Sequence, residues 1–503
     1  MSSFWIESTK NLEKDYPKLS EDISVDVCII GGGLVGITSA YFLADSDLKV
    51  AVIERDKICS HVSGMSTAKI TSQHNLFYDY LINSYGIDFA KGYLDANEDA
   101  IERIKNIIQK EKIDCDFSNQ DSYVYAYSKD EVDDIKKEVE AMTTLGFPCE
   151  FVKKVPLPID CLGAIKISNQ GQFNPRKYAL ALCDIITKKG IDIYTDTVVT
   201  KVENSDDGYI ISTENNSIKA KYVILATHYP IVNFPGFYFL KMYQSMSYVI
   251  AVDTKCDVPE GMYINSSDPI YSFRTTPFND KKLLIVAGAD HKTGEKINLE
   301  HAYEILENKA KELYPNSEVL YRWCTEDCIS LDKIPYIGDF SSIMPNLYVA
   351  TGFKKWGITF SNVASKIITD KILGIENKYE DLFKATRLEP IKNHEELGNM
   401  IKESIYSLVI NKLKDSPDTL EDVGIDEGRI IEIDDKKVGV YKDRNGKCFF
   451  VKPVCAHLGC ELSFNNAEKT WDCPCHGSRY DINGNVISEP AIENIEKLRD
   501  FTK

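Results

Sequence analysis

Two short boxes of cysteine and histidine near one end of this 503-residue chain constrain its fold more than any other feature. The first box spans residues 455–460 (CAHLGC), the second spans residues 473–478 (CPCHGS), and twelve residues separate them. Two thiolates can hold one iron of a two-iron cluster, and two neutral imidazoles can hold the other. Imidazoles leave the cluster less negative than four thiolates would, so it is easier to reduce. The boxes therefore predict a [2Fe-2S] centre that carries single electrons.

The boxes and the residues that follow them, Gly477-Ser478-Arg479-Tyr480, resemble the Rieske iron–sulfur domain over about residues 425–500. The resemblance implies a small all-β domain whose cluster ligands are Cys455, His457, Cys473 and His476. It also implies a disulfide between Cys460 and Cys475 that ties the two ligand loops together. The hydroxyl groups of Ser478 and Tyr480 match the donors to a cluster sulfur and a ligand sulfur, which raise the redox potential.

A structural zinc site is the alternative for the same boxes. Cysteine and histidine pairs at short spacing also suit tetrahedral Zn²⁺. The Cys-x-His order of the first box and the additional cysteine in each box favour the iron–sulfur cluster.

A second motif lies near the other end of the chain. An apolar run at residues 25–30 is followed at once by GGGLVG at residues 31–36, a helix-like stretch at 37–44, and a second apolar run at 49–53 that ends in Glu54. This order predicts a βαβ dinucleotide fold, in which the glycines allow a pyrophosphate to approach the backbone at a helix amino end. A glutamate at the end of the second strand favours an unphosphorylated ribose, so FAD or NAD fits better than NADP.

Three further segments favour FAD. Residues 63–70 (SGMSTAKI), 222–228 (YVILATH) and 347–359 (LYVATGFKKWGIT) resemble, in this order, flavin-contacting segments of the D-amino acid oxidase and sarcosine oxidase superfamily. The resemblance covers about residues 20–385. It implies a Rossmann-type α/β domain that binds FAD, with an antiparallel substrate sheet drawn from residues 238–253 and 271–289. The FAD-binding residues that we expect are Gly31, Gly33, Leu34, Val35, Gly36, Glu54, Arg55, Ser63, Ser66, Thr67, Val199, Ala226, Thr227, Gly352, Trp356, Gly357, Ile358 and Thr359.

The domain organisation that we predict has three parts. Residues 1–387 form the FAD-dependent oxidoreductase module, residues 388–423 form a helical linker, and residues 424–503 form the Rieske domain. Within the linker, residues 395–414 have apolar side chains at helical spacing, which indicates a helix that packs on the protein rather than a membrane anchor.

Composition excludes several classes of function. The net charge of −18 argues against nucleic-acid binding, which needs clustered Lys and Arg. We expect no membrane span, because no apolar run approaches the roughly 20 residues required, and a cytoplasmic location, because the first residues lack a signal-peptide pattern. Ten of the fourteen cysteines lie outside the two boxes, and we expect them to be free thiols of a reducing compartment.

The two cofactors together indicate the reaction. A flavin takes two electrons from a substrate, whereas the cluster carries one, so their combination predicts a converter between two-electron and one-electron chemistry. We expect oxidation of a small amine or amino acid at a C–N bond, with electrons passing singly through the cluster to an external acceptor. The alternatives are a reductase, with an external one-electron donor, and a redox sensor or electron carrier without a turnover substrate. A Rieske oxygenase is disfavoured because the eight histidines show no second iron-binding set.

Four residues are candidates for the substrate site. Arg274 is expected to pair with a substrate carboxylate, unless it is an ordinary surface arginine. His74 and His291 are expected to line the cavity, although a hydrogen-bonded structural histidine fits either position equally well. Lys355 is expected near the flavin ring, where a cation stabilises a reduced, anionic flavin.

Overall fold

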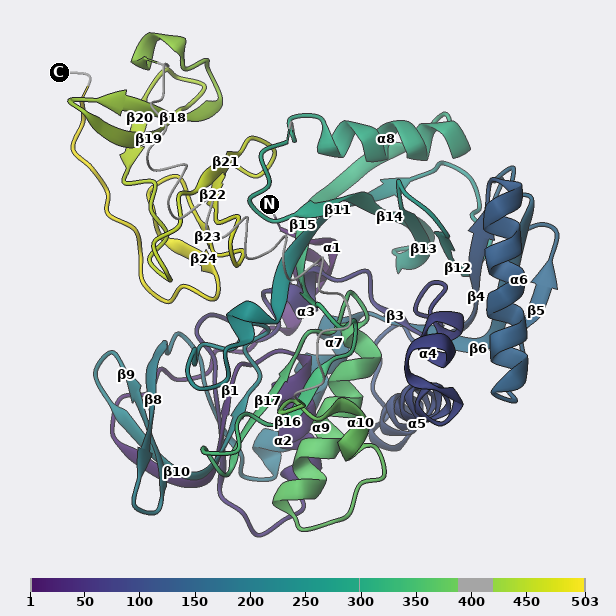
Figure 1. The fold of residues 1–503 in the computed structure, drawn as a ribbon, viewed down its shortest axis with the longest axis horizontal. Helices are drawn as coiled ribbons and strands as arrows, with labels where there is room; N and C mark the ends of the chain where they lie inside the picture. Colours follow the sequence, from purple (N-terminus) through teal and green to yellow (C-terminus); the bar gives the residue numbers. More distant parts are fainter. Residues whose placement is uncertain (1, 298, 388–418, 502–503) are drawn as a thin grey trace.

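A computed structural model describes residues 2–297, 299–387 and 419–501 of the chain. Two large mixed sheets with their helices form the FAD-dependent module, and two small sheets form a separate body at the carboxyl end (Figure 1). The predicted linker at 388–423 lies almost entirely outside the described residues, and the predicted helix at 395–414 does so completely.

The first sheet is the nucleotide-binding sheet. Its eight strands follow the order β16-β17-β10-β1-β2-β7, with β8 and β9 off this path. β1 pairs in parallel with both β2 and β10, as a βαβ unit requires. The strands are β1 (Ile23–Ile30), β2 (Val50–Ile53), β7 (Asp192–Tyr194), β8 (Val199–Ser205), β9 (Gly208–Thr213), β10 (Ser217–Leu225), β16 (Tyr336–Asp339) and β17 (Leu347–Thr351).

The second sheet corresponds to the expected substrate sheet. Its nine strands follow the order β15-β11-β14-β13-β12-β4-β6-β3, with β5 paired to β6. β11, β13, β14 and β15 pair antiparallel, as predicted. The strands are β3 (Lys69–Ile70), β4 (Ser118–Ala126), β5 (Glu150–Val152), β6 (Gly163–Gln172), β11 (Met242–Asp253), β12 (Met262–Asn265), β13 (Tyr271–Phe278), β14 (Lys281–Lys292) and β15 (Glu318–Ser330).

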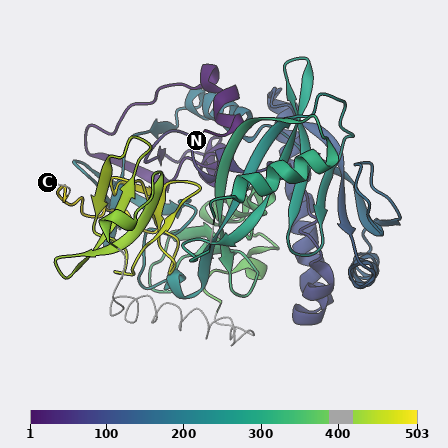
Figure 2. The same cartoon turned by 90° about the horizontal axis from the view of Figure 1, so that it is seen from above.

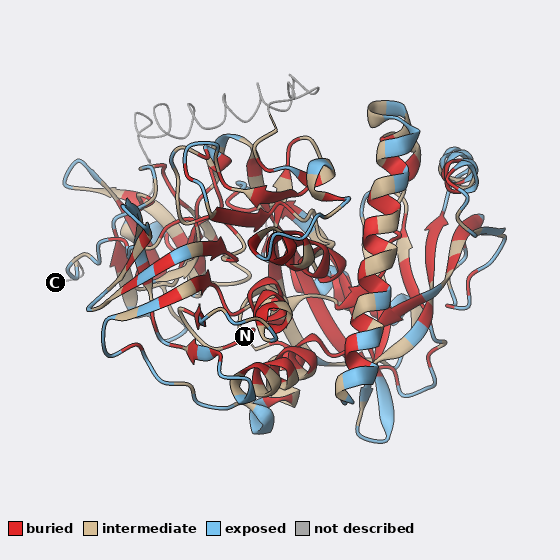
Figure 3. Cartoon of the chain, turned by 90° about the horizontal axis from the view of Figure 1, so that it is seen from below, coloured by how far each residue is buried: buried red, intermediate tan, exposed pale blue. Residues whose placement is uncertain are grey.

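Helices cover both sheets. The α2 helix packs against α7 and α9, and nearly all of its residues are buried because it lies between other elements. Buried positions, red in Figure 3, lie mainly in the central strands of both sheets and in the helices packed among them. The helices are α1 (Phe4–Ser8), α2 (Leu34–Leu43), α3 (Val62–Met65), α4 (Tyr78–Tyr85), α5 (Ile87–Glu111), α6 (Lys129–Thr144), α7 (Pro175–Lys188), α8 (Ala302–Leu313), α9 (Gly357–Ile372) and α10 (Glu380–Phe383).

The carboxyl-terminal body is all β, as predicted. One small sheet has the order β18-β19-β20 and the other β21-β22-β23-β24. Both views of the cartoon place this body, in yellow and light green, beside β11 and β15 of the substrate sheet (Figures 1 and 2). The strands are β18 (Glu427–Ile433), β19 (Lys436–Lys442), β20 (Cys448–Val451), β21 (Ser463–Asn465), β22 (Thr470–Asp472), β23 (Arg479–Tyr480) and β24 (Val486–Ser488).

Candidate functional site

A cavity of about 800 Å³ lies between the nucleotide-binding sheet and the substrate sheet. This volume is within the range of cofactor and small-molecule sites. The expected FAD-binding residues line it, with the exception of Gly36, Gly352 and Thr359. The cavity also reaches Ser245, Ser247 and Ser272 of the substrate sheet, so one space serves both parts of the expected site.

The glycine turn before α2 leaves no room for side chains. Gly31 has a φ of +113°, and a Cβ there would lie 2.4 Å from the carbonyl oxygen of Ala226. A Cβ on Gly36 would lie only 1.9 Å from the carbonyl oxygen of Gly31. The backbone is therefore open to a pyrophosphate at the amino end of the ten-residue α2 helix, which favours negative charge.

Glu54 directly follows β2, as the sequence predicts. Its Oε2 accepts from the amide of Gly32 at 2.6 Å, and its Oε1 accepts from the amide of Asp56 at 2.8 Å. Burial raises the pKa of the carboxyl group, and the two backbone bonds oppose that shift. These bonds hold the carboxyl group at the wall of the cavity, and its contact with a ribose stays a prediction.

Arg55 has a second role that sequence reasoning missed. It lines the cavity, but its guanidinium also reaches the carboxyl-terminal body, where Nη1 lies 2.8 Å from Glu489 Oε1 and Nη2 donates to the carbonyl of Ile487 at 2.9 Å. Asp56 lies 2.7 Å from its Nε. Arg55 therefore joins the nucleotide site to the second domain.

Arg274 lies outside the set of residues that line the cavity. It is only 1% exposed. Its Nη1 donates to the carbonyls of Ala68, Phe173 and Thr67 at 2.6, 3.1 and 3.2 Å. Nη1 thus holds the loop before β3, whereas Nη2 is buried without a hydrogen-bond partner among the described residues. The contact of Arg274 with a substrate carboxylate stays a prediction.

The two candidate histidines occupy different places. His74 lines the cavity, but its Nδ1 lies 2.7 Å from Tyr93 Oη and its Nε2 lies 3.0 Å from the carbonyl oxygen of Thr71. Burial lowers its pKa to about 3, so the ring is neutral. His291 stacks on Tyr248 and is not among the cavity-lining residues. These contacts favour the structural alternative for both.

Lys355 lines the cavity. Its Nζ lies 2.5 Å from Asp290 and donates to Ser247 at 3.2 Å. These bonds tie the turn before α9 to the substrate sheet. The proximity of Lys355 to a flavin ring stays a prediction.

Lys69 and Asp327 are among the charged residues of the cavity that sequence reasoning missed. Lys69 Nζ donates to the carbonyl of Tyr263 at 3.1 Å and to Ser272, and burial lowers its pKa to about 7. Asp327 also lines the cavity, and burial raises its pKa to about 7. Lys69 belongs to the segment at residues 63–70 (SGMSTAKI), in which it is the only charged residue. A single charge among small and apolar residues was the sequence signal for this site.

The two cysteine–histidine boxes meet at the tip of the carboxyl-terminal body. The imidazoles of His457 and His476 are perpendicular, with centroids 4.9 Å apart, and the Nδ1 atom of each is buried without a hydrogen-bond partner in the described part of the chain. Cys455 and Cys473 are buried free thiols. The interaction between the two thiols lowers the pKa of Cys455 and raises that of Cys473. Two sulfurs and two free imidazole nitrogens fit the donor set of a Rieske cluster.

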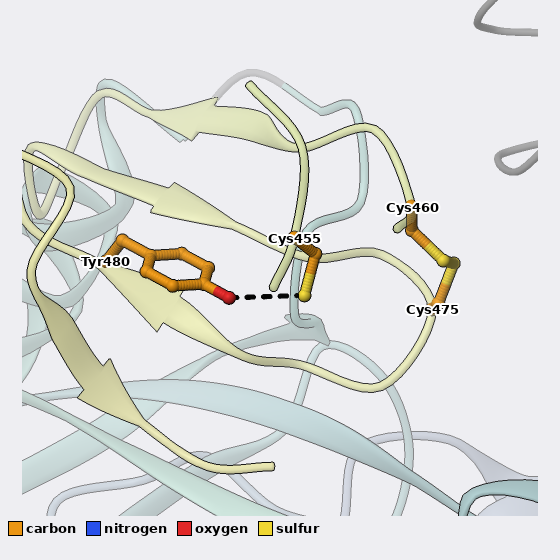
Figure 4. The surroundings of a disulfide bond; sticks show 4 residues. All are labelled: Cys455, Cys460, Cys475 and Tyr480. Atoms are coloured by element: carbon orange, nitrogen blue, oxygen red, sulfur yellow. Dashed lines mark hydrogen bonds between the residues drawn. A yellow bond between two sulfur atoms is a disulfide. The ribbon is translucent and has the colours of Figure 1, made fainter. Parts of the chain in front are cut away.

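Three of the remaining predicted residues, Cys460, Cys475 and Tyr480, are drawn with the ligand Cys455 in Figure 4. Cys460 and Cys475 form a disulfide with a Cα–Cα distance of 6.6 Å, the pairing that the resemblance implies. Tyr480 Oη lies 3.3 Å from Cys455 Sγ and accepts from the amide of Ala456 at 3.0 Å. Ser478 Oγ accepts from the amide of Ala491 at 3.0 Å, which leaves its own proton for an acceptor at the ligand site.

Comparisons with known proteins agree with both halves of this description. Residues 26–371 match the family described as FAD dependent oxidoreductase, and residues 419–499 match the Rieske [2Fe-2S] domain. The second match favours the cluster over the zinc alternative. The chain is 36% identical to the putative Rieske 2Fe-2S iron-sulfur protein YhfW of Bacillus subtilis, over 99% of this chain and 97% of that protein. It is 22% identical to the gamma-glutamylputrescine oxidoreductase of Escherichia coli, over 75% of this chain and 91% of that protein.

Solved structures show the same fold for the larger module. Glycine oxidase from Geobacillus kaustophilus matches with a TM-score of 0.63 at 19% identity, covering 73% of this chain and 100% of that one. L-amino acid deaminase from Proteus vulgaris matches with a TM-score of 0.61 at 16% identity, covering 75% of this chain and 99% of that one. Among the described helices, none combines the length and apolar character that crossing a bilayer requires. The chain therefore belongs to the FAD-dependent oxidoreductase family and carries a carboxyl-terminal Rieske domain, with FAD and a [2Fe-2S] cluster as its cofactors.

Proposed function

We propose that this oxidoreductase removes two electrons from a small amine or amino acid at a C–N bond and passes them singly through the Rieske cluster to an external one-electron acceptor. The substrate loses hydrogen from carbon and nitrogen and becomes an imine. When bound, FAD supplies the two-electron oxidation and the cluster supplies one-electron transfer. The residues of the chain supply binding, orientation and charge.

One observation carries this proposal. The cavity is lined by the glycine turn and also by four residues of the Rieske domain, namely Arg479, Ile487, Ser488 and Glu489. A cavity shared by the nucleotide site and the cluster domain favours direct exchange of electrons between them over two independent functions.

Charged groups in the cavity support an amine or amino acid as the substrate. Lys69 and Asp327 both line the cavity. In our proposal Lys69 binds a carboxylate and Asp327 binds an ammonium group. The names of several relatives point the same way: gamma-glutamylputrescine oxidoreductase, glycine oxidase and L-amino acid deaminase. Lys355 is a further candidate in our proposal, as the cation that offsets negative charge on the reduced flavin.

The test is anaerobic stopped-flow mixing of the holoprotein with a panel of N-methylated amino acids, primary amino acids and amines. Flavin and cluster absorbance are followed together. We expect one member of the panel to bleach the flavin first and the cluster afterwards. A flavin that bleaches while the cluster stays oxidised would contradict the electron route.

The same experiment separates the alternatives. Bleaching by NADH, and not by amines, would favour a reductase. No bleaching by either class would favour a redox sensor or carrier. A His457→Ala/His476→Ala variant, in which the cluster cannot form, is the control, and its flavin should still bleach with the substrate.

A further inference from the structure

One stretch of the FAD module contacts both histidines of the cluster site. After β10 the chain forms the turn Ala226-Thr227, which lines the cavity, and residues 229–244 then lead into β11 and include its first three residues. We call residues 229–244 the capping segment. It carries three side chains that contact the second ligand box or the histidines, namely Asn233, Phe239 and Gln244.

Asn233 makes the most specific of these contacts. Its Oδ1 lies 2.8 Å from Nε2 of His457. The Nδ1 atom of the same ring is buried and has no other partner in the described residues, so it is the nitrogen left to bind iron. With iron on Nδ1, the ring carries its proton on Nε2 and donates it to Asn233.

Phe239 and Gln244 fix the surroundings of this bond. The Phe239 ring is perpendicular to that of His476, with centroids 5.8 Å apart, and its centroid lies 6.3 Å from that of His457. Gln244 is 2% exposed and donates to the carbonyls of His476 at 3.3 Å and Glu489 at 2.7 Å. Gly477 faces Gln244 so closely that a Cβ would lie 2.5 Å from it, at a φ of +85°. The second box is therefore held firmly against the capping segment.

We propose that Asn233 is a positioning residue for the cluster, which fixes the ring of His457 and lowers the redox potential of the cluster. An acceptor on the outer nitrogen of a ligand histidine makes that ligand more basic, and a more basic ligand stabilises the oxidised iron. The tuning bond thus comes from the FAD module, in addition to the hydroxyl groups inside the Rieske domain. This inference goes beyond the proposed function, because it holds for either direction of electron flow and for any substrate.

The test is a redox titration of the cluster in the full-length holoprotein, followed by EPR and visible circular dichroism. In Asn233→Ala we expect the potential to shift upward and the EPR g-values to change, because His457 loses its acceptor. In Asn233→Asp we expect a downward shift, because the acceptor is kept and gains a negative charge. Asn215→Ala, in an exposed turn between β9 and β10, is the matched control and should match the wild type.

Each outcome decides the proposal. An Asn233→Ala protein with full cluster content and an unchanged potential would overturn it. If Asn233→Ala does not retain its cluster, the Asp variant decides, and an unchanged or raised potential there would also overturn it. The titration uses dithionite and ferricyanide and needs no substrate, so its result does not depend on whether amine oxidation is correct.

Discussion

Arg55 and Glu489 form an ion pair that joins the nucleotide site to the Rieske domain, with Nη1 and Oε1 2.8 Å apart. Arg55 directly follows Glu54, the first residue after β2, and Glu489 directly follows β24. The pair therefore connects the edge of the FAD cavity to the loop after the last strand of the cluster domain. Its side chains are only 21% and 20% exposed, so solvent screens it less than a surface pair.

We expect Arg55→Met to weaken this junction. Removing one partner of a buried ion pair lowers the free energy of unfolding by about 3–5 kcal/mol. Removing one partner of an exposed pair lowers it by about 0–1 kcal/mol. For this half-buried pair we expect a loss of about 2 kcal/mol in the free energy of unfolding, measured by urea denaturation. Lys18→Met removes a pair with Glu214 in which both side chains are more than half exposed, and it should change stability little. If the double variant Arg55→Met/Glu489→Gln loses as much free energy of unfolding as the two single variants lose together, the two residues are not coupled.

The glycine turn gives a prediction on cofactor content. Gly36→Ala places a methyl group against the carbonyl oxygen of Gly31, where the ideal distance is 1.9 Å, so the turn must open. We expect the purified variant to lose most of its FAD, measured by the flavin absorbance released on denaturation. Gly92→Ala on α5 is the matched control, because its methyl group meets only the flexible end of Leu382. Normal FAD content in Gly36→Ala would contradict this reading of the turn.

The disulfide should stabilise the cluster site. It closes a loop with a sequence separation of 15, for which the chain-entropy estimate is about 3 kcal/mol. We expect Cys460→Ser/Cys475→Ser to lose its cluster faster than the wild type on heating, measured by the decay of cluster absorbance. Cys256→Ser, at an exposed free cysteine, is the control. Equal rates of cluster loss would show that the two ligand loops are held without the disulfide.

The parts of this protein that local sequence determines were predictable. The βαβ unit depends on two apolar runs and a glycine turn, and the predicted strands at 25–30 and 49–53 correspond to β1 and β2. The ligand boxes are equally local, since each combines a cysteine and a histidine within a few residues. The antiparallel substrate sheet and the all-β Rieske domain followed from family resemblance and agree with the structure.

Contacts between distant segments were not predictable in the same way. Arg274 was expected at the substrate, but its partners are carbonyls of Thr67, Ala68 and Phe173, which no local pattern connects to it. Lys69 contacts Ser272 of β13, and Asn233 contacts His457 of the Rieske domain. Neither contact is visible in the local sequence. Single-sequence reasoning identifies the residue types of a site, whereas burial and long-range pairing decide which of them face it.

Lys69 gives a prediction on the pH dependence of ligand binding. Burial lowers its pKa to about 7, so its amine is a cation below that pH and is neutral above it. We expect the affinity of a carboxylate probe such as benzoate, followed by its perturbation of the flavin spectrum, to fall as the pH rises through about 7. In Lys69→Met binding should be weak at every pH, and in Lys69→Arg it should persist at high pH. The same pH profile in the wild type and in Lys69→Met would exclude Lys69 as the cation.

Glu326 makes the folded state sensitive to pH at the junction between the domains. It is 6% exposed, accepts from Ser488 Oγ at 2.5 Å and lies 3.8 Å from Arg479. Burial raises its pKa from 4.5 to about 7, although Arg479 opposes the shift. Between pH 4.5 and about pH 7 the folded protein binds more protons than the unfolded chain. Its stability therefore falls as the pH rises through this range.

Glu326→Gln should remove this part of the pH dependence. A rise from 4.5 to about 7 corresponds to as much as about 3 kcal/mol between the ends of the window. We expect the stability of the variant, measured by chemical denaturation at several pH values, to decline less steeply than that of the wild type. The decline does not vanish, because the pKa of Asp327 is raised to about 7 by burial and acts with the same sign. The control is Glu140→Gln, at an exposed position of α6, in which stability should decline with pH as steeply as in the wild type. If stability declines as steeply in Glu326→Gln, the carboxyl group of Glu326 is ionised in the folded protein.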